Sequence, residues 1–310
     1  MLQNRIASDL YAYSSFPTEY RIVLLNELKR GNYDVIIGVH APLASRLATL
    51  KKDLPKETTL IGWIHNSFEA LFSESSLYIG ANRKRHYVYQ FRKLDHVVLL
   101  CHHDAKTYYG YDPVFKPTVI YNPLTLKPGK TSQGNTKRFL AVGRFSHRHK
   151  GFDMLIEAFH IFAQKNSEWH LDIVGEGVEE KMYRELIEKY HLTDRVTIHP
   201  FTNHVQDYYS QAQVYVLSSR WEGFGLVLVE AMAHGLPVIS SDLPTSQEIM
   251  GDFGLYFKNG DIGELAQRLE DATKLNWAAK SKEAIEISQR FEVEHIIKQW
   301  KQLIETSIHE

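Results

Sequence analysis

Short apolar runs alternate with helical segments along the second half of the chain, and this alternation limits the possible folds more than any other feature. Six runs are rich in β-branched and aromatic residues: 138–144, 169–175, 195–200, 214–219, 236–242 and 253–257. The segments between them have the apolar period of helices: 151–166, 177–190, 204–211, 226–234, 244–250 and 261–274. Short apolar strands separated by helices indicate a parallel sheet covered on both faces, and therefore a doubly wound, Rossmann-like domain.

The first half shows a weaker form of the same pattern. Strands are predicted at 33–40, 58–65, 96–101 and 117–122, and helices at 18–30, 41–52, 79–94 and 103–109. A chain of 310 residues is near the upper limit for one hydrophobic core, so two domains are expected. We place the first at 1–122, a linker rich in Pro, Gly, Ser and Lys at 123–137, and the second at 138–290. The segment 291–310 is predicted to be a helix that returns to the first domain.

The composition excludes several classes of protein. The 36 basic and 37 acidic residues nearly cancel, so no global charge favours nucleic acid. The single cysteine, Cys101, excludes an internal disulfide. The N-terminal residues lack the pattern of a signal peptide, and no apolar stretch is long enough to span a bilayer. We therefore expect a cytoplasmic protein, with peripheral contact at most to the inner face of a membrane.

The segment GRFSHRHKG follows the first strand of the second domain. Arg144 and Lys150 lie on this loop, between Gly143 and Gly151, which permit close approach of the backbone. Two cations at the end of such a strand suit a diphosphate. A solvated basic loop is the alternative, and this motif alone does not decide between them.

The segment SSRWEGFGLVLVEAMAHGLPVISSD carries a stronger signal at 218–242. Glycines at a helix start expose unpaired N–H groups, and the helix dipole adds positive potential there, so that phosphate is held without a metal. Glu222 precedes the predicted helix and Glu230 lies inside it. Because a carboxylate accepts hydrogen bonds from neighbouring hydroxyls, each glutamate could hold a sugar. The surrounding helix is almost wholly apolar, so Glu230 requires a partner or a ligand.

These residues resemble the signature of retaining glycosyltransferases of family 4, which have the GT-B architecture of two Rossmann-like domains facing across a cleft. The signature has two glutamates separated by seven residues, as Glu222 and Glu230 are, within S-x-x-EGFGL-x-x-x-EAMA-x-G-x-PV. The resemblance extends from about Phe139 to Leu269. It implies transfer of a hexose from a nucleotide diphosphate sugar, with UDP as the expected nucleotide, to a hydroxyl acceptor with retention. Bacterial surface polysaccharide or glycoconjugate synthesis is the implied setting.

The resemblance also implies roles for individual residues. Catalytic roles fall to Glu222, Arg144, Lys150 and, in the first domain, to His65 within IGWIHNSFEA, where the family keeps a histidine facing the anomeric carbon. The implied donor-binding residues are Gly143, Arg144, Lys150, Gly175, Phe201, Glu222, Gly223, Phe224, Gly225, Leu226 and Glu230. No metal or other cofactor is implied, because cations and a helix end neutralise the phosphates. An ordinary histidine remains the alternative for His65.

Other features of the first half leave alternatives open. The run 81–93 interleaves basic and aromatic residues, which suits either an anionic membrane surface or a solvated helix with a half-buried aromatic face. The pair His102 and His103 followed by Asp104 indicates a helix start rather than a metal site. Residues 1–32 also lack the strand and glycine-rich turn with which the family opens. We therefore expect a truncated first domain whose sheet edge an oligomer or a partner covers.

The sequence thus predicts a glycosyltransferase that acts on a nucleotide sugar and on a glycan or lipid-linked acceptor. A non-catalytic donor-binding or partner subunit is the main alternative. A nucleotide-sugar epimerase on the same scaffold is the third interpretation, which the spaced glutamates disfavour.

Overall fold

The protein is described here by a computed structural model that covers residues 2–146 and 149–309. The chain divides into two compact units, one formed by Met1–Asn122 with Glu294–Glu310 and the other by Pro123–Val293. Each unit contains one sheet, and all strand pairs in both sheets are parallel. The predicted α/β class with two parallel sheets is confirmed.

The second unit has a doubly wound sheet of six strands. Their order is β10-β9-β8-β5-β6-β7, so the chain starts in the middle, winds outward to β7, and returns to the other side of the starting strand at β8. The strands are β5 (Arg138–Val142), β6 (His170–Val174), β7 (Val196–His199), β8 (Val214–Leu217), β9 (Val238–Ser241) and β10 (Leu255–Phe257). The order reverses between β5 and β8, where Phe139 pairs with Val214 and Leu140 with Tyr215.

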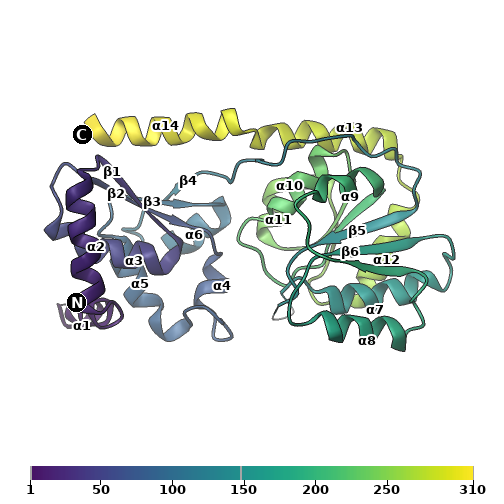
Figure 1. Cartoon of the computed structure of the whole chain (residues 1–310), viewed down its shortest axis with the longest axis horizontal. Helices are drawn as coiled ribbons and strands as arrows, with labels where there is room; N and C mark the ends of the chain where they lie inside the picture. Colours follow the sequence, from purple (N-terminus) through teal and green to yellow (C-terminus); the bar gives the residue numbers. More distant parts are fainter. Residues whose placement is uncertain (1, 147–148, 310) are drawn as a thin grey trace. The chain divides into compact units, whose positions relative to one another are not determined.

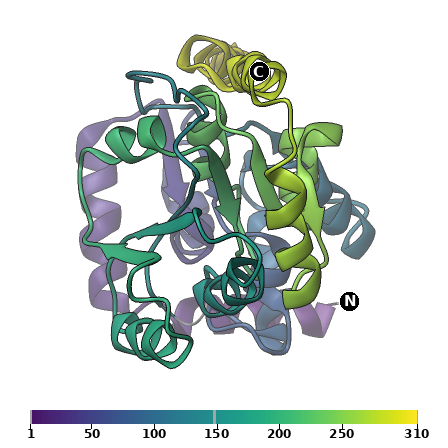
Figure 2. The same ribbon diagram turned by 90° about the vertical axis from the view of Figure 1, so that its right-hand side faces the viewer.

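Helices cover both faces of this sheet (Figures 1 and 2). They are α7 (Phe152–Ala163), α8 (Glu180–Lys189), α9 (Val205–Gln211), α10 (Leu226–Ala233), α11 (Pro244–Met250), α12 (Ile262–Ala272) and α13 (Trp277–Ser288), with a 3-10 helix η3 at Gly251–Phe253. Except for α13 and η3, their bounds lie within a few residues of the predicted helices. The alternation of apolar runs and helical segments therefore located the elements of this unit.

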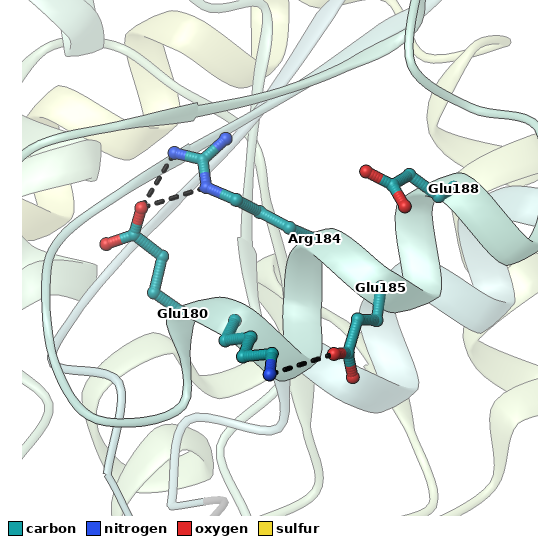
Figure 3. A pocket seen from close by; sticks show the side chains of 5 residues that line it. Glu180, Arg184, Glu185 and Glu188 are labelled. Carbon is teal, nitrogen blue, oxygen red and sulfur yellow. Dashed lines mark hydrogen bonds and ion pairs between the residues drawn. The ribbon is translucent and has the colours of Figure 1, made fainter.

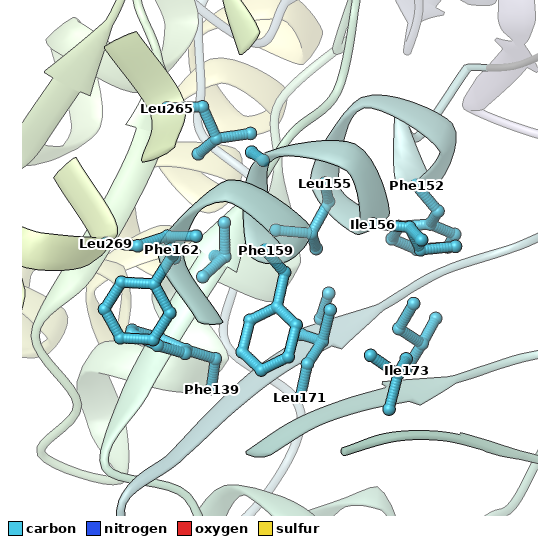
Figure 4. Close-up of a cluster of buried hydrophobic side chains, with 14 of the residues drawn as sticks. Phe139, Phe152, Leu155, Ile156, Phe159, Phe162, Leu171, Ile173, Leu265 and Leu269 are labelled. Carbon is cyan, nitrogen blue, oxygen red and sulfur yellow. The ribbon is translucent and has the colours of Figure 1, made fainter. Parts of the chain in front are cut away.

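Aromatic side chains form the centre of the second unit's core (Figure 4). Phe139 of β5 stacks on Trp169 at 4.5 Å and meets Phe162 of α7 edge-on at 5.3 Å. Leu265 and Leu269 of α12 are fully buried in the same cluster. Burying each such side chain contributes about 1.5–3 kcal/mol, so this core holds β5 and α7 firmly together. The loop between them therefore has two fixed ends.

The first unit has a four-stranded sheet of order β1-β2-β3-β4 (Figure 1). Its strands are β1 (Val35–Val39), β2 (Thr59–Ile64), β3 (His96–Leu99) and β4 (Thr118–Val119), the last much shorter than predicted. Its helices are α1 (Leu2–Ser14), α2 (Thr18–Gly31), α3 (His40–Leu50), α4 (Phe68–Phe72), α5 (Lys84–Phe91), α6 (His102–Tyr111) and α14 (Val293–His309), with 3-10 helices η1 (Lys51–Asp53) and η2 (Ala81–Arg83). Helices α1 and α4 fall outside the predicted set.

The C-terminal helix α14 packs on the first unit's sheet. Its residue Ile296 is buried together with Ile61 of β2 and Val98 of β3, and Trp300 meets Trp63 edge-on at 5.0 Å. Ser307 hydrogen-bonds to His96 at 2.8 Å. The segment 291–310, predicted as a returning helix, corresponds to α14, which follows α13 and the 3-10 helix η4 (Gln289–Phe291) and begins at Val293.

The segment 123–137, expected as a linker, packs on the second unit. The backbone N–H of Leu124 donates to the carbonyl oxygen of Phe291 at 2.7 Å. Ser132 is buried, and its N–H donates to the carbonyl of His234 at 3.1 Å. Pro, Gly and Ser in this segment therefore support turns against a surface rather than a free connection.

Two elements near the start of the first unit expose apolar side chains. Helix α2 has no buried residue among those described, and Tyr20 and Val23 are 70% and 62% exposed. Strand β1 is an edge strand whose Ile37 is also exposed. Among the described residues, no helix is long and apolar enough to cross a membrane.

Candidate functional site

Two loops of the second unit meet where its strand order reverses. In doubly wound sheets, ligands bind outside the carboxyl ends of the strands at this switch point. The loop after β5 contains Gly143, Arg144 and Lys150, and the loop after β8 runs from Ser218 to the start of α10 at Leu226. The topology therefore brings together both segments that the sequence singled out.

Lys150 and Glu222 form an ion pair between these loops. The Lys150 Nζ lies 2.6 Å from Glu222 Oε1, and the Ser219 hydroxyl donates to the same oxygen at 2.7 Å. The Glu222 side chain is only 8% exposed. Burial alone would raise the pKa of Glu222, but Lys150, His149 and Ser219 hold that pKa below its ordinary value. A buried carboxylate is thus kept charged next to a buried cation.

The backbone around Gly151 brings the two loops into contact. Gly151 has φ +64°, and a Cβ added there would lie 2.0 Å from the carbonyl oxygen of Ser218. The Ser218 hydroxyl donates to the carbonyl oxygen of Lys150 at 2.7 Å. Only glycine fits this approach without strain, so Gly151 fixes the position of Lys150. Arg144 is exposed on the same loop, and residues 147 and 148 lie outside the described part of the chain.

Two further contacts hold the loop after β8, and neither was predicted from the sequence. The His149 ring stacks on Trp221 at 4.9 Å, and His149 Nε2 lies 2.6 Å from the Trp221 carbonyl oxygen. The Arg220 guanidinium forms a bidentate pair with Asp153 of α7, with both distances 2.8 Å. Such partners follow from the path of the backbone and not from sequence spacing.

Helix α10 begins directly at this loop. Gly225 is the N-cap residue of α10 and has φ +86°. Among the described residues, no side chain caps the first turn of the helix. The first amides therefore have no side-chain acceptor in the described part of the chain, and the helix dipole adds partial positive charge there. Phe224 is buried against Phe291 at 5.8 Å, which anchors the turn that contains Gly223. This helix start is suited to an anionic group.

Glu230 lies inside α10 and meets a buried tyrosine. The Tyr209 hydroxyl donates to Glu230 Oε2 at 2.9 Å. Burial raises the pKa of Glu230 above its ordinary value, against the opposing effects of the Tyr209 hydrogen bond and the charge of Lys150. The apolar character of α10 predicted that Glu230 needs a partner, and Tyr209 is one that spacing did not identify.

The remaining predicted residues of this unit follow the other strands. Gly143 comes after β5 and its N–H donates to the Val174 carbonyl at 3.0 Å, next to Gly175 after β6. Phe201 follows β7, the outermost strand on that side, and is 60% exposed. The structure therefore brings Lys150 together with Glu222, whereas Phe201 lies after a strand further along the sheet.

In the first unit, His65 directly follows β2 and lies beside a second histidine. The ring centroids of His40 and His65 are 4.8 Å apart, and the Trp63 ring lies 4.3 Å from that of His65. Burial, with a smaller effect of His40, lowers the pKa of His65 to about 4. His40 is exposed and adopts a left-handed backbone with φ +65°, which is rare for a residue with a side chain. This backbone conformation is what distinguishes His40, and because the sequence does not reveal it, His40 was not singled out from the sequence.

The remaining candidate features are metal-binding groups and hollows outside the two loops. Among the described residues, no group of three or more His, Cys, Asp or Glu side chains could hold a metal ion. A hollow of about 460 Å³ runs along α8 and is lined by Glu180, Lys181, Arg184, Glu185 and Glu188 (Figure 3). Arg184 pairs with Glu180 at 2.7 Å and Lys181 with Glu185 at 3.8 Å, so the hollow is the charged outer face of one helix.

Comparison with known sequences places the second unit in a described family. The family model for glycosyl transferases of group 1 matches residues 125–291. An uncharacterized glycosyltransferase of Haemophilus influenzae is 32% identical over 60% of this chain and 54% of its own length. An amylovoran biosynthesis glycosyltransferase of Erwinia amylovora is 36% identical over 38% of this chain and 33% of its length. The chain thus spans about half or less of these relatives.

Comparison with solved structures extends to nearly the whole chain. The Anabaena protein HepE, solved in complex with UDP, aligns with 93% of this chain and 82% of its own, with a TM-score of 0.80 and 21% identity. At this identity the likeness shows the fold alone. The two parallel sheets belong to the GT-B architecture.

Proposed function

Because the chain belongs to the glycosyl transferases of group 1, we propose that it transfers a hexose from a UDP-linked donor to a hydroxyl acceptor. We further propose that the anomeric configuration is retained, as in family 4. Bacterial surface polysaccharide or glycoconjugate synthesis is the proposed setting, and the amylovoran relative supports it.

The observation that carries this proposal is the convergence at the switch point of the second unit. A buried cation, an uncapped helix start and two carboxylates come from the loops after β5 and β8 and from α10. Cations and helix amides bind phosphate, and carboxylates accept hydrogen bonds from sugar hydroxyls. A diphosphate linked to two sugars presents both kinds of group.

The proposed reaction needs no group beyond the donor, the acceptor and these residues. The acceptor hydroxyl oxygen forms a bond to the anomeric carbon on the face from which the diphosphate leaves. The bond between that carbon and the diphosphate oxygen breaks, and the acceptor proton passes to the departing diphosphate. Arg144, Lys150 and the amides from Gly223 to Leu226 stabilise the negative charge that develops there.

The glutamates and the first unit's histidine have separate roles in this proposal. Glu222 accepts hydrogen bonds from the transferred sugar, because it is charged and oriented by Lys150 and Ser219. Glu230 accepts hydrogen bonds from the ribose. His65 acts on the acceptor side as a neutral imidazole, in keeping with its lowered pKa. Gly143, Gly175 and Phe201 contact the nucleotide.

Thermal unfolding with a panel of nucleotides tests the proposal. A bound donor raises the unfolding temperature by mass action, so UDP and UDP-sugars should raise it more than GDP or ADP compounds at equal concentration. Equal responses to all three nucleotides would remove the assignment of UDP. No response to any nucleotide would contradict the transferase proposal itself.

A mutation in the first unit separates donor binding from transfer. His65→Ala should leave UDP affinity unchanged and should reduce transfer to an acceptor at saturating donor. His40→Ala is the matched variant, because the two rings lie side by side but only His65 is assigned a role. If only the His40 variant loses transfer, the acceptor-side role moves to His40.

A non-catalytic donor-binding or partner subunit is the second candidate. It is favoured by the exposed apolar side chains of α2 and edge strand β1, which suit an oligomer or a partner chain. Donor binding without hydrolysis or transfer, across a panel of glycan and lipid-linked acceptors, would support this candidate. Light scattering would show whether the protein self-associates.

Peripheral membrane contact through residues 81–93 is also a proposal. Several of these basic side chains have partners within the first unit, since Arg92 pairs with Asp112 at 3.1 Å and Lys93 pairs with Asp9. Lys84 lies over the Tyr111 ring at 5.0 Å. Sedimentation with anionic and neutral vesicles tests the contact, and equal binding to both would contradict it.

A further inference from the structure

We propose that Tyr209 is a positioning residue that holds the Glu230 carboxylate for the vicinal hydroxyls of the donor ribose. This inference rests on the proposed function, in which Glu230 accepts hydrogen bonds from the ribose. It concerns a side chain on α9, outside the two loops that carry the sequence signature.

The Tyr209 ring is fixed by its surroundings. It is fully buried, stacks on His234 with a centroid distance of 5.0 Å, and lies 5.9 Å from the Tyr215 ring. His234 is in turn held to α10, because its Nδ1 lies 2.7 Å from the Glu230 carbonyl oxygen. These contacts hold the ring in place, and its hydroxyl donates to Glu230 Oε2 at 2.9 Å.

This hydrogen bond uses only part of the carboxylate. An ionised carboxylate offers about four acceptor positions on its two oxygens. Among the described residues, Tyr209 is the side chain that donates to Glu230, at Oε2. Oε1 and the second lone pair of Oε2 are therefore open to a ligand, and two hydroxyls on neighbouring carbons are the donors that match them.

The hydrogen bond also lowers the cost of binding. A glutamate side chain loses rotational freedom when a ligand fixes it, and a buried partner that fixes it beforehand removes part of that cost. A buried carboxylate with no donor would further be driven toward its neutral form, which cannot accept as strongly. Tyr209 therefore orients the Glu230 carboxylate and favours its charged form.

Among the described residues, the charged and titratable groups near Glu230 come from four places. They are Tyr209 on α9, Tyr215 on β8, Lys150 on the loop after β5, and His234 at the end of α10. Of these, Tyr209 and Lys150 favour the charged carboxylate. Removing the Tyr209 hydroxyl should therefore raise the pH at which Glu230 becomes protonated.

Calorimetry with UDP and 2′,3′-dideoxy-UDP tests the role of Tyr209. Tyr209→Phe keeps the ring and removes the hydroxyl, and we expect UDP affinity to fall by about tenfold, the size of one hydrogen bond to a charged group. The same change should alter affinity for the dideoxy analogue by less than about twofold, because that analogue lacks the hydroxyls that Glu230 would bind. In a Glu230→Gln background, Tyr209→Phe should have little further effect.

A pH series gives a readout that a structural role alone would not change. The ratio of UDP affinity to dideoxy-UDP affinity cancels titration of the phosphates. This ratio should fall on acidification as Glu230 is protonated, and the fall should begin at a higher pH in Tyr209→Phe than in the wild type.

Tyr183→Phe is the matched control. Tyr183 is also fully buried, and its hydroxyl donates to Glu179 Oε2 at 2.9 Å rather than to Glu230. Loss of that hydrogen bond should cost stability without changing the ratio between the two nucleotides.

The outcomes separate this inference from the proposed function. Equal losses of affinity for UDP and dideoxy-UDP in Tyr209→Phe would make Tyr209 an ordinary core residue and overturn the inference. If wild-type protein binds neither nucleotide, the proposed function itself fails. If Tyr209→Phe unfolds, Glu230→Gln must still abolish the preference of the protein for UDP over the analogue, and a retained preference also overturns the inference.

Discussion

The Lys150 ammonium and the Glu222 carboxylate are 2.6 Å apart although 72 residues separate them in the chain. Both side chains are nearly buried, at 12% and 8% exposure. Burying either charge without its partner would destabilise the folded protein. Each loop therefore depends on the other to keep its buried charge paired. In the proposed function, Lys150 binds the donor phosphate and Glu222 the transferred sugar.

Replacing Lys150 should therefore destabilise the fold as well as weaken donor binding. Lys150→Met leaves the Glu222 charge unpaired, and we expect a loss of about 3–5 kcal/mol in the free energy of unfolding at neutral pH. Adding Glu222→Gln should recover most of that loss, because the buried charge is removed. Denaturant unfolding measures both. A double variant as unstable as the single one would show that the ion pair does not connect the loops.

Gly151 should tolerate no side chain. Gly151→Ala adds a Cβ that would lie 2.0 Å from the Ser218 carbonyl oxygen, in a backbone with positive φ, and we expect a loss of more than about 2 kcal/mol. Gly251→Ala is the matched control, because Gly251 also has positive φ but no atom within 4 Å of the added Cβ. Its smaller loss would measure backbone strain alone. Equal losses at both positions would contradict the close contact at Ser218.

Donor binding should be independent of divalent metal. Lys150, Arg144 and the start of α10 already present positive charge to a diphosphate, so a metal is not needed to neutralise it. UDP affinity measured in EDTA and in excess Mg²⁺ should agree within about twofold once the ionic strength is matched. A tenfold loss in EDTA, restored by Mg²⁺, would overturn this expectation.

His65 should make the first unit sensitive to acid. Burial and His40 lower the pKa of His65 to about 4 in the folded protein, against an ordinary value of 6.5. The neutral ring is therefore favoured by folding, and its contribution to stability is complete above pH 6.5 and is lost as the pH falls toward 4. NMR titration should place the His65 midpoint near 4. A midpoint near 6.5 would show that the ring is solvated.

The sequence predicted the second unit well, because its strands and helices have regular apolar periods. The glutamate pair, the glycines and Lys150 stood out in local segments of the sequence, and the family resemblance implied their roles. The partners of these residues could not be recognised in the same way. Tyr209, Asp153 and Trp221 reach the site through the order of strands and the packing of helices, which no local pattern encodes.

The first unit was harder to predict for the same reason. Strand β4 is two residues long, and α14 reaches the sheet only by returning from the far end of the chain. His40 is marked by a backbone conformation that the sequence GVHAP does not reveal. Its contact with His65 depends on the pairing of β1 with β2.

Calorimetry of UDP with the wild type, Lys150→Ala and Glu230→Ala tests the central claim most directly. If a cation and a helix-borne carboxylate hold opposite ends of one nucleotide, each substitution should weaken UDP binding by about tenfold or more while heat capacity scans show a folded protein. Unchanged affinity in both folded variants would mean that the nucleotide, if it binds, does so elsewhere.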